Sequence, residues 1–469
     1  MRTSLRWLHR YLTPADLTAE EADHVLTHVG FPIEEQVPLP DGDVQLDVEL
    51  TSNRGDCLCH VGLAREIAAS TGRALTVPRT SLQPTGPDVS TLTSVDNRVP
   101  EVCPVFTARI IRGVTVGPSP DWLVGCLEAI GQRSINNIVD ISNFVLFELG
   151  HPNHTFDLDT LKGGLVVRYA EPGEKLTCLD DIEHKLAPSD LVVADQGRAV
   201  SLAGVIGGRA TGVSDATRNV LIEVATWDPT HVRNTARRHQ ITTDAGHRFE
   251  RYVDARDVEA ASQRVAELIL EIAGGELCEG VVVAGRADAP RTEVDLRLSR
   301  CEHLLGIAVP RDEVVRLLRQ VGVEVAETAS PDVLHCTIPP HRHDVTREVD
   351  LIEEVIRLRG IEHIEVSPRM SVSVSPPQAD ERAARLLGDV LTGLGFYETV
   401  TVSFLTRAHA APFVPPGVRL LKVDEERRKE NPFLRPAIIP SLLTCRKANQ
   451  DGRVQTPAGV RLFETAAVF

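Results

Sequence analysis

The sequence predicts a multidomain α+β protein, and three observations carry that prediction. The chain of 469 residues is too long for one hydrophobic core and is expected to form about three or four domains. Its apolar content of 42% and charged content of 25% are typical of soluble globular proteins. Strand-like and helix-like runs alternate without a repeat, and stretches rich in Pro, Ser, Thr and Asp divide them. The predicted domains are 1–76, 101–283, 293–366 and 380–469.

Composition also limits the classes of function. No run of ~18 apolar residues is present, so we expect no membrane span. The N-terminal segment lacks the continuous apolar core of a signal peptide, and we predict a cytoplasmic protein. The net charge of −16 argues against nonspecific coating of nucleic acid, although a local basic patch could still contact RNA.

The nine cysteines predict reduced thiols rather than a disulfide framework. Their number is odd, and they are scattered singly except for Cys57 and Cys59, which His60 follows. This cluster could supply half of a zinc site. Because no second cysteine pair lies at zinc-ribbon spacing, we favour thiols packed at the start of a helix.

The first predicted domain, 1–76, is a small α/β unit. Residues 17–30 have a helical period and end at a glycine, which is a typical C-cap. Residues 44–50 alternate like a strand, and residues 51–72 open with capping candidates and continue as a helix. Residues 77–100 show little periodicity and are predicted to be a linker.

The second predicted domain, 101–283, is the largest and is a mixed α+β unit. Its strand-like runs and its helical runs are interspersed. The strand-like runs are 105–116, 163–170, 190–195 and 219–226, and the helical runs are 121–131 and 255–275. A second linker is expected at 287–294.

The two remaining domains are smaller. In 293–366 we expect amphipathic helices, a strand and a final acidic helix. A third linker, 367–380, precedes the last domain, which begins with a helix and ends on an apolar run. The expected elements are helices at 299–306, 310–322 and 380–396, and strands at 333–340, 397–405 and 461–469.

Four carboxylates gather around the start of the acidic helix. Asp350, Glu353 and Glu354 stand at i, i+3 and i+4 and so share one face, while Asp344 lies six residues earlier, after a Pro-Pro turn from which the chain could fold back. Acidic groups are favoured at a helix N-terminus, so a solvated first turn is one interpretation. The other is a site for a hard cation, which would relieve the repulsion among the four.

Polar residues also interrupt the apolar runs of the second domain. They could form a pocket with a hydroxyl, a histidine and a carboxylate that hydrolyses an ester by means of a positioned water. The alternative is ordinary loop polarity. No G-x-S-x-G, P-loop or G-x-G-x-x-G motif is present. The positions concerned are Ser142, Asn143, His151, His154, Glu223, Ala245, His247 and Arg248, with the glycines of 201–208.

Four long segments together resemble the beta subunit of bacterial phenylalanyl-tRNA synthetase, in the order of that family. They begin with TSNRGDCLCHVGLAREIAAS and SINNIVDISNFVLFELGHPNHTFD. The other two are TTDAGHRFERYVD and RHDVTREVDLIEEVIRLRGIEHI. The segments are 51–70, 134–157, 242–254 and 342–364, and the likeness extends over nearly the whole chain.

The resemblance implies a subunit of a phenylalanine–tRNA ligase. An alpha partner would activate phenylalanine with ATP in an α2β2 tetramer, and the substrate would be the tRNA for phenylalanine. Residues 293–366 would be a winged-helix-like α/β domain, and 380–469 part of an antiparallel-sheet, class II synthetase-like domain without catalytic function. Asp344, Asp350, Glu353 and Glu354 fall on the family's Mg²⁺ positions, which are shared with the alpha subunit.

The resemblance also makes 101–283 an editing domain that hydrolyses tyrosine mistakenly attached to the tRNA. An apolar synthetic pocket discriminates poorly against an analogue that adds a hydroxyl, so a second pocket is needed. Glu223 would recognise the tyrosine hydroxyl, and Ala245 would leave room for the ring. His154 and Ser142 would position the ester or its water, with Asn143 and the 204–208 loop lining the site.

Several positions depart from the family pattern. Ser142 replaces a threonine, residues 151–155 are bulkier and more polar than usual, and Gly246 replaces a serine. Only Glu34 to Asp47 bridge the place where most relatives insert an OB-type RNA-binding module, so we expect that module to be absent. The C-terminal part is shorter than in the family, as in a fragment or a decayed paralogue. A free-standing trans-editing hydrolase and a noncatalytic scaffold or RNA-binding remnant therefore remain alternative functions.

Overall fold

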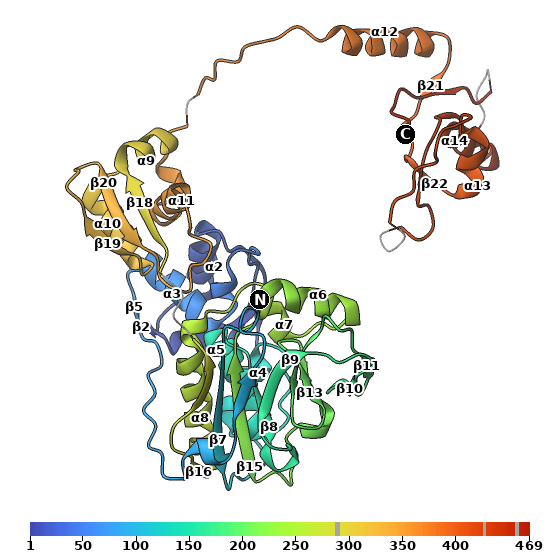
Figure 1. The fold of residues 1–469 in the computed structure, drawn as a ribbon. Coiled ribbons are helices and arrows are strands. Elements are labelled where there is room, and N and C mark those ends of the chain that lie inside the picture. Colours follow the sequence, from blue (N-terminus) through green and yellow to red (C-terminus); the bar gives the residue numbers. More distant parts are fainter. Residues whose placement is uncertain (287–290, 367, 425–427, 455–458) are drawn as a thin grey trace. The chain divides into compact units, whose positions relative to one another are not determined.

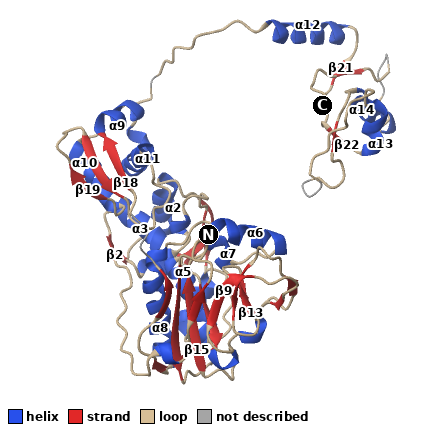
Figure 2. Ribbon diagram, in the orientation of Figure 1, coloured by secondary structure: helices blue, strands red, loops and turns tan. Residues whose placement is uncertain are grey.

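The computed structural model describes residues 1–286, 291–366, 368–424, 428–454 and 459–469, and the chain forms two compact units. Unit 1 comprises residues 1–366 and unit 2 comprises residues 367–469, and each is described by itself (Figure 1). Helices and strands are mixed in both units (Figure 2), as the predicted fold class requires. In the part of the chain that the structure describes, no helix has the length and apolar character to cross a membrane.

The first 76 residues combine a three-stranded antiparallel sheet with helices. The strand order is β1-β4-β3, so the hairpin of β3 and β4 occupies the bridge from Glu34 to Asp47. The predicted helix at 17–30 is confirmed, and the Thr18 side chain caps it by accepting from the N–H of Glu21. The elements are β1 (Arg2–Ser4), α1 (Leu5–His9), α2 (Ala19–His28), β3 (Ile33–Pro38), β4 (Val44–Val48) and α3 (His60–Thr71).

Helix α3 begins later than predicted, at His60 rather than near residue 51, because the residues before it form turns. The sulfur of Cys59 caps the helix by accepting from the N–H of Gly62 at 3.2 Å. The imidazole of His60 stacks on Trp7 with 3.8 Å between ring centroids. Cys57 and Cys59 are buried free thiols, which confirms the prediction of packed cysteines at a helix start.

The middle of unit 1 contains two five-stranded sheets. One has the order β16-β7-β15-β8 with β17 beside β7, and the other has the order β14-β13-β12-β9-β6. The strands of the first are β7 (Val105–Arg112), β8 (Asn153–Asp157), β15 (Asn219–Ala225), β16 (Glu276–Leu277) and β17 (Val282–Gly285). Those of the second are β6 (Val95–Asn97), β9 (Leu165–Tyr169), β12 (Leu191–Ala194), β13 (Ala199–Leu202) and β14 (Ile206–Gly207).

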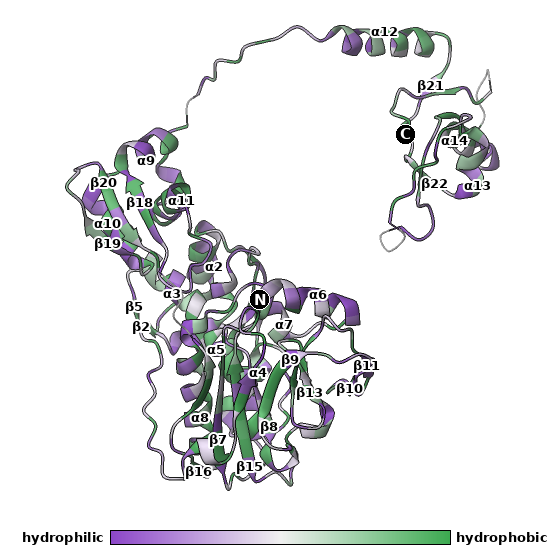
Figure 3. Cartoon of the chain, viewed as in Figure 1, coloured by the Kyte–Doolittle hydropathy of each residue, from purple (hydrophilic) through white to green (hydrophobic). Residues whose placement is uncertain are grey.

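The two faces of β15 enter different cores. Val220 and Val224 pack with α5 (Asn137–Leu149) and α8 (Val258–Ala273). Leu221 and Ala225 pack with the second sheet. These strands carry mostly the green of apolar residues in Figure 3. Because side chains alternate along a strand, Glu223 lies on the same face as Leu221 and Ala225, in an otherwise apolar interior.

The prediction that residues 77–100 form a linker is wrong for the last part of this segment. Residues 95–97 form β6, which pairs in parallel with β9 and extends the second sheet. The segment is short and polar, so its pairing depends on the neighbouring strand rather than on its own apolar pattern. The second predicted linker, 287–294, falls partly on residues 287–290, which lie outside the described residues, and β18 begins at residue 293.

Residues 293–361 form an antiparallel sheet of order β18-β20-β19 with three helices. Their apolar core is not separate from the N-terminal segment, because Ala69 of α3 is part of it. Strand β20 and the helices agree with the predicted elements. The elements are β18 (Glu293–Arg297), α9 (Leu298–Leu305), α10 (Arg311–Gln320), β19 (Glu324–Glu327), β20 (Val333–Thr337) and α11 (Glu348–Arg359).

Unit 2 departs from the predicted antiparallel sheet. Strand β21 pairs with β24 in parallel, and β22 pairs with β23 in a separate antiparallel pair. The parallel pair forms because the chain crosses over between the two strands through α14. The elements are α12 (Ala379–Gly393), β21 (Tyr397–Glu398), β22 (Phe404–Leu405), α13 (Arg407–Ala410), β23 (Phe433–Leu434), α14 (Ile439–Asp451) and β24 (Leu462–Phe463).

Candidate functional site

His154 and Glu223 occupy facing positions on neighbouring strands. The antiparallel register of β8 and β15 places Glu223 directly opposite His154. Side chains at opposite positions point to the same face of a sheet, so both project between the two sheets. Phe156 shares this face of β8, and its ring lies edge-on to the His154 imidazole with 4.4 Å between centroids.

Glu223 is buried and His154 is half-buried, and neither has a full set of hydrogen bonds. Within the described chain, Oε2 of Glu223 and Nε2 of His154 have no hydrogen-bond partner. Burial raises the pKa of Glu223 to about 8 and lowers the pKa of His154 to about 4. Both groups are therefore mainly uncharged at pH 7. Buried, unpaired polar atoms of this kind are costly and are typical of sites that bind a polar ligand.

A glycine-rich loop closes over this pair. Gly204 has φ +68°, a conformation that favours glycine, and a Cβ there would lie 2.8 Å from Cδ1 of Trp227. A Cβ at Gly207 would lie 2.3 Å from Cε1 of His154. Only glycine therefore lets the loop approach the imidazole this closely.

The loop and the sheet enclose a pocket with about 400 Å³ of empty space, its open mouth included. The short helix α7 (Asp244–Phe249) forms one wall with Ala245 and Phe249. The Thr243 hydroxyl fixes α7 against the loop by donating to the carbonyl of Val205 at 2.8 Å and accepting from the N–H of Gly246 at 3.0 Å. The lining residues are Pro152, Asn153, His154, Ser201, Leu202, Gly204, Val205, Ile206, Gly207, Glu223, Ala225, Trp227, Ala245 and Phe249.

The acidic helix start lies elsewhere in unit 1 and is tied to arginines. Arg342 donates to both carboxylate oxygens of Glu354, at 2.7 Å each, and to both oxygens of Asp344, at 2.9 Å each. Arg357 also contacts Glu354, and it donates to Glu66 of α3 at 2.6 Å. Because of these bonds, and despite the opposing effect of burial, the pKa of Glu354 lies well below its usual range.

Comparisons with known proteins identify the family. The phenylalanine–tRNA ligase beta subunit of Rhodopirellula baltica is 40% identical over 472 residues, covering 100% of this chain and 68% of that protein. The chain belongs to the phenylalanine–tRNA ligase beta-subunit family. The beta subunit of Geobacter sulfurreducens is 37% identical, covering 97% of this chain and 57% of that protein. The family recognised from the four segments is thereby confirmed.

Family models place three domains of such beta subunits along the chain. The B3/4 domain matches residues 102–274, and the tRNA synthetase B5 domain matches residues 294–361. The phenylalanyl-tRNA synthetase beta chain CLM domain matches residues 365–469. A crystal structure of an N-terminal fragment of the phenylalanyl-tRNA synthetase beta subunit from Pyrococcus horikoshii gives a TM-score of 0.45 at 17% identity. It covers 76% of this chain and 99% of that one.

Within this beta-subunit chain, the structure brings together three of the five predicted pocket residues. His154, Glu223 and Ala245 line one pocket inside the matched B3/4 domain. Ser142 and Asn143 lie on α5 and do not line it. The Ser142 hydroxyl instead donates to Oδ1 of Asn153 at 2.8 Å, so it reaches the pocket through that side chain.

Sequence reasoning missed the aromatic walls of the pocket. Trp227 follows β15 by two residues, and Phe249 lies in the TTDAGHRFERYVD segment. Their position next to the candidate residues was the available signal. Each also looks like an ordinary core residue, because isolated aromatic residues usually pack in cores. Asn153 was missed for a different reason, because the candidate residue next to it, His154, accounted for the polar character of this segment.

The four carboxylates predicted to bind Mg²⁺ do not form a ready site in this family member. In the described residues, no three of them bring ligand oxygens within 4.8 Å of one another. Arg342 neutralises Asp344 and Glu354, while Asp350 accepts from the N–H groups of Thr346 and Arg347 at the start of α11. Glu353 is exposed. These residues therefore do not fit a complete magnesium site within the chain.

Proposed function

We propose that this chain acts as the beta subunit of a phenylalanine–tRNA ligase and that its B3/4 pocket hydrolyses tyrosyl-tRNA. The family membership supports the first part. The observation that carries the second is that Glu223 and His154 both line the pocket and each has a buried polar atom without a hydrogen-bond partner in the described chain. A pocket of this kind binds a ligand that supplies the missing hydrogen bonds.

Glu223 is the group that distinguishes tyrosine from phenylalanine in this proposal. A tyrosine hydroxyl would satisfy the orphan oxygen of Glu223, whereas phenylalanine would leave that oxygen buried and unpaired. Because the pKa of Glu223 is about 8, its mainly neutral carboxyl can both donate to and accept from the hydroxyl. Ala245 leaves space for the ring because its side chain is small.

His154 positions the reacting groups. Its neutral imidazole presents Nε2 to the pocket and is held between Phe156 and Gly207. In the hydrolysis, water adds to the ester carbonyl, and the tRNA ribose oxygen leaves with a proton. We expect His154 to orient the water or the ester through Nε2. Ser142 acts indirectly, by orienting Asn153 through their hydrogen bond.

The acceptor end of the tRNA would approach along α6 (Pro229–His239). Arg233 and Arg237 are exposed and lie one helical turn apart, and neither has an ion-pair partner among the described side chains. Arg237 lines a surface hollow together with Thr243 and Gly246, beside the Ala245 wall of the pocket. Two exposed arginines on one helix, without ion-pair partners among the described side chains, stand out in a chain with a net charge of −16, and phosphates bind such positions.

The alpha partner would supply amino-acid activation with ATP, in an α2β2 assembly. Helix α12 supports the presence of a partner, since it has no buried residue and exposes Leu386, Leu387, Val390 and Leu394. Any Mg²⁺ at the start of α11 would be shared with that partner. Exposed Glu353 is its available ligand, whereas Asp350 is half-buried and already accepts from Arg347 at 2.8 Å.

Hydrolysis of tyrosyl-tRNA tests the pocket. We expect the protein to release tyrosine faster than phenylalanine from the same tRNA, and Glu223→Ala to reduce that preference roughly 10- to 100-fold, the worth of one hydrogen bond to a buried carboxyl. The exposed Glu276, at the far end of the sheet, provides the control variant Glu276→Gln. Equal tyrosine release by the wild type and Glu223→Ala would refute the proposed role of the pocket.

Association with an alpha subunit tests the ligase assignment separately. Mixing the chain with the alpha subunit encoded in the same genome should give a complex that charges the tRNA with phenylalanine. No association at micromolar concentrations would contradict it. Because the pocket lies within unit 1, hydrolysis in the absence of association would favour the free-standing trans-editing hydrolase. Absence of both would favour the noncatalytic scaffold.

A further inference from the structure

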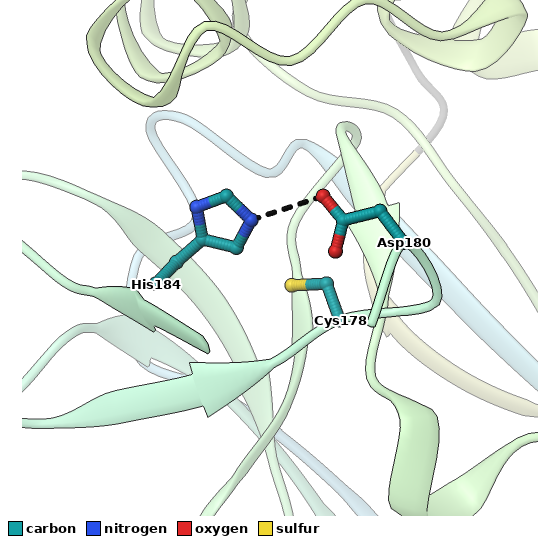
Figure 4. Close-up of side chains that lie close together, drawn as sticks. All are labelled: Cys178, Asp180 and His184. Carbon is teal, nitrogen blue, oxygen red and sulfur yellow. Dashed lines mark hydrogen bonds and ion pairs between the residues drawn. The ribbon is translucent and has the colours of Figure 1, made fainter. Parts of the chain in front are cut away.

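A second cluster of polar side chains lies on the hairpin of β10 (Lys175–Thr177) and β11 (Glu183–Lys185). The Cys178 thiol, the Asp180 carboxylate and the His184 imidazole point toward one another (Figure 4). One ligand atom from each lies within 4.8 Å of the others. We propose that this hairpin binds a borderline transition-metal ion such as Zn²⁺. The site is separate from the Glu223 pocket, and its existence does not depend on the proposed function.

The turn of the hairpin holds the three side chains in this arrangement. The N–H of Cys178 donates to the carbonyl of Ile182 at 3.1 Å, and the N–H of Asp181 donates to the carbonyl of Cys178 at 3.0 Å. Asp181 has φ +63°, which tightens the turn. The N–H of Ile182 donates to Oδ1 of Asp180 at 3.0 Å, leaving Oδ2 3.1 Å from Nε2 of His184.

The donor set selects the kind of ion. Thiolate, imidazole and carboxylate together are ligands for Zn²⁺ or Co²⁺, whereas Mg²⁺ and Ca²⁺ prefer oxygen ligands alone. Around a tetrahedral ion, ligand atoms lie about 3.5 Å apart. The cluster must therefore contract slightly, which Asp180 allows because its side chain is the most exposed of the three. The fourth position is open to water from that side.

The surroundings of His184 and Cys178 affect how an ion would bind. His184 meets the ring of His239 edge-on with 5.3 Å between centroids, and Nε2 of His239 lies 2.7 Å from Asp190. Burial raises the pKa of the Cys178 thiol to about 12, so the thiol carries its proton when no ion is present. An ion must displace this proton to solvent, and binding should release about one proton and strengthen as the pH rises.

A similar-looking cluster in the same chain does not have these properties. Asp56, Cys57 and Glu66 also lie within ligand distance of one another. However, the Arg54 guanidinium already contacts all three, at 2.9 Å from Oδ2 of Asp56 and 3.3 Å from the sulfur of Cys57. This cation satisfies the carboxylates and leaves no place for an ion. Among the described residues, no lysine or arginine contacts Cys178, Asp180 or His184 in this way.

An ion on the hairpin would also steady the pocket loop. The N–H of Leu179 donates to the carbonyl of Gly207 at 3.0 Å, and Cys178 forms a β-bridge with Gly208. Gly207 is the residue that packs against the His154 ring. A bound ion would therefore restrict the movement of the loop through two backbone contacts, and Zn²⁺ should raise the melting temperature of unit 1.

Cobalt binding to the full chain tests the site. The chelator-treated protein should bind one Co²⁺ with the charge-transfer absorption of a cobalt–thiolate bond. Cys178→Ser should lose that band and weaken Co²⁺ binding at least 10-fold. Cys126→Ser, which alters a half-buried thiol on helix α4 (Asp121–Ala129), should retain both the absorption band and the Co²⁺ affinity. One proton released per Zn²⁺ in the wild type would support the proposal independently.

Two results would overturn the site. One is a wild-type chain without a cobalt–thiolate band at excess Co²⁺. The other is the same band in Cys178→Ser as in the wild type. If Cys178→Ser does not fold, Asp180→Asn decides the question, since this side chain is partly exposed and its loss leaves the buried thiol in place. Unchanged Co²⁺ affinity in a folded Asp180→Asn variant would likewise reject the site, and a 10-fold weaker affinity would support it.

Discussion

Glu223 on β15 lies directly opposite His154 on β8, and each side chain has one buried polar atom without a hydrogen-bond partner in the described structure. Burial moves their two pKa values in opposite directions, to about 8 for the carboxyl and about 4 for the imidazole. Across the interval between these values, both groups are mainly neutral. The pocket therefore offers uncharged hydrogen-bonding groups in an apolar interior, which suits a phenolic ligand better than an ionic one.

The pKa of Glu223 predicts a pH-dependent effect of Glu223→Gln on stability. The folded protein keeps this carboxyl protonated up to about pH 8, whereas the unfolded chain loses the proton near its usual value. The native state thus binds more protons between these values, and this group makes the wild type less stable as the pH rises. The uncharged glutamine does not cause this loss of stability. The free energy of unfolding of the variant, relative to that of the wild type, should therefore rise by up to about 1.4 kcal/mol per pH unit.

Unfolding by urea at pH 5, 6.5 and 8 measures this difference. The three tryptophans, Trp7, Trp122 and Trp227, all lie in unit 1 and report its unfolding by fluorescence. Glu276→Gln, at an exposed position, should show no such trend. A difference between Glu223→Gln and the wild type that stays constant with pH would mean that Glu223 is charged in the folded protein.

Replacing Arg357 should destabilise unit 1 strongly. Its guanidinium lies between Glu66 of α3 and Glu354 of α11, and all three side chains are buried or nearly so. Arg357→Leu leaves two buried carboxylates with one arginine each, Arg54 and Arg342. We expect a loss of about 3 kcal/mol, the lower end of the cost of breaking a buried ion pair.

The same urea unfolding experiment measures this loss. Arg316→Leu on α10 removes an exposed arginine and should cost less than about 0.5 kcal/mol. Adding Glu66→Gln to Arg357→Leu should recover part of the stability, because Arg54 then has one buried carboxylate to balance instead of two. Equal effects of the two arginine variants would show that the network contributes nothing beyond surface charge.

The arginines of α6 predict salt-dependent binding of tRNA. Arg233→Glu/Arg237→Glu should weaken binding and reduce the slope of log Kd against log salt by about 1 to 2, since each phosphate contact contributes about 0.7 to 0.9. Filter binding between low and physiological salt measures the slope. Arg319→Glu, an exposed change on α10, is the matched control. An unchanged slope in the α6 variant would place the tRNA elsewhere.

Much of the local structure follows from the sequence, because it depends on period and caps. The strand-like apolar run 219–226 correctly predicts a strand, and the resemblance picked Glu223 and His154, which the strand pairing brings together. The contacts between distant segments did not follow from the sequence. The pairing of Arg342 with Asp344 and Glu354 turns an apparent cation site into an ion-pair network. No local sequence pattern predicts which cation will pair with a given carboxylate.

Other differences have similar causes. Ser142 lies on α5 outside the pocket lining, and its hydroxyl donates to Asn153, which does line the pocket. Residues 95–97 form a strand only because β9 offers them a free edge. Cys178 and His184 are six residues apart on two strands of a hairpin, and they meet only when the turn between them is formed.

The double contact of Arg357 has a consequence for how such chains can be recombined. The segments on either side of this residue share one buried ion-pair network, because its guanidinium contacts Glu66 in one and Glu354 in the other. A chimaera that takes residues 293–366 from a distant relative keeps that balance only when the donor brings a cation to the same position. Whether a chimaera with a crossover point between α3 and α11 is stable should therefore depend on this one side chain rather than on overall sequence identity.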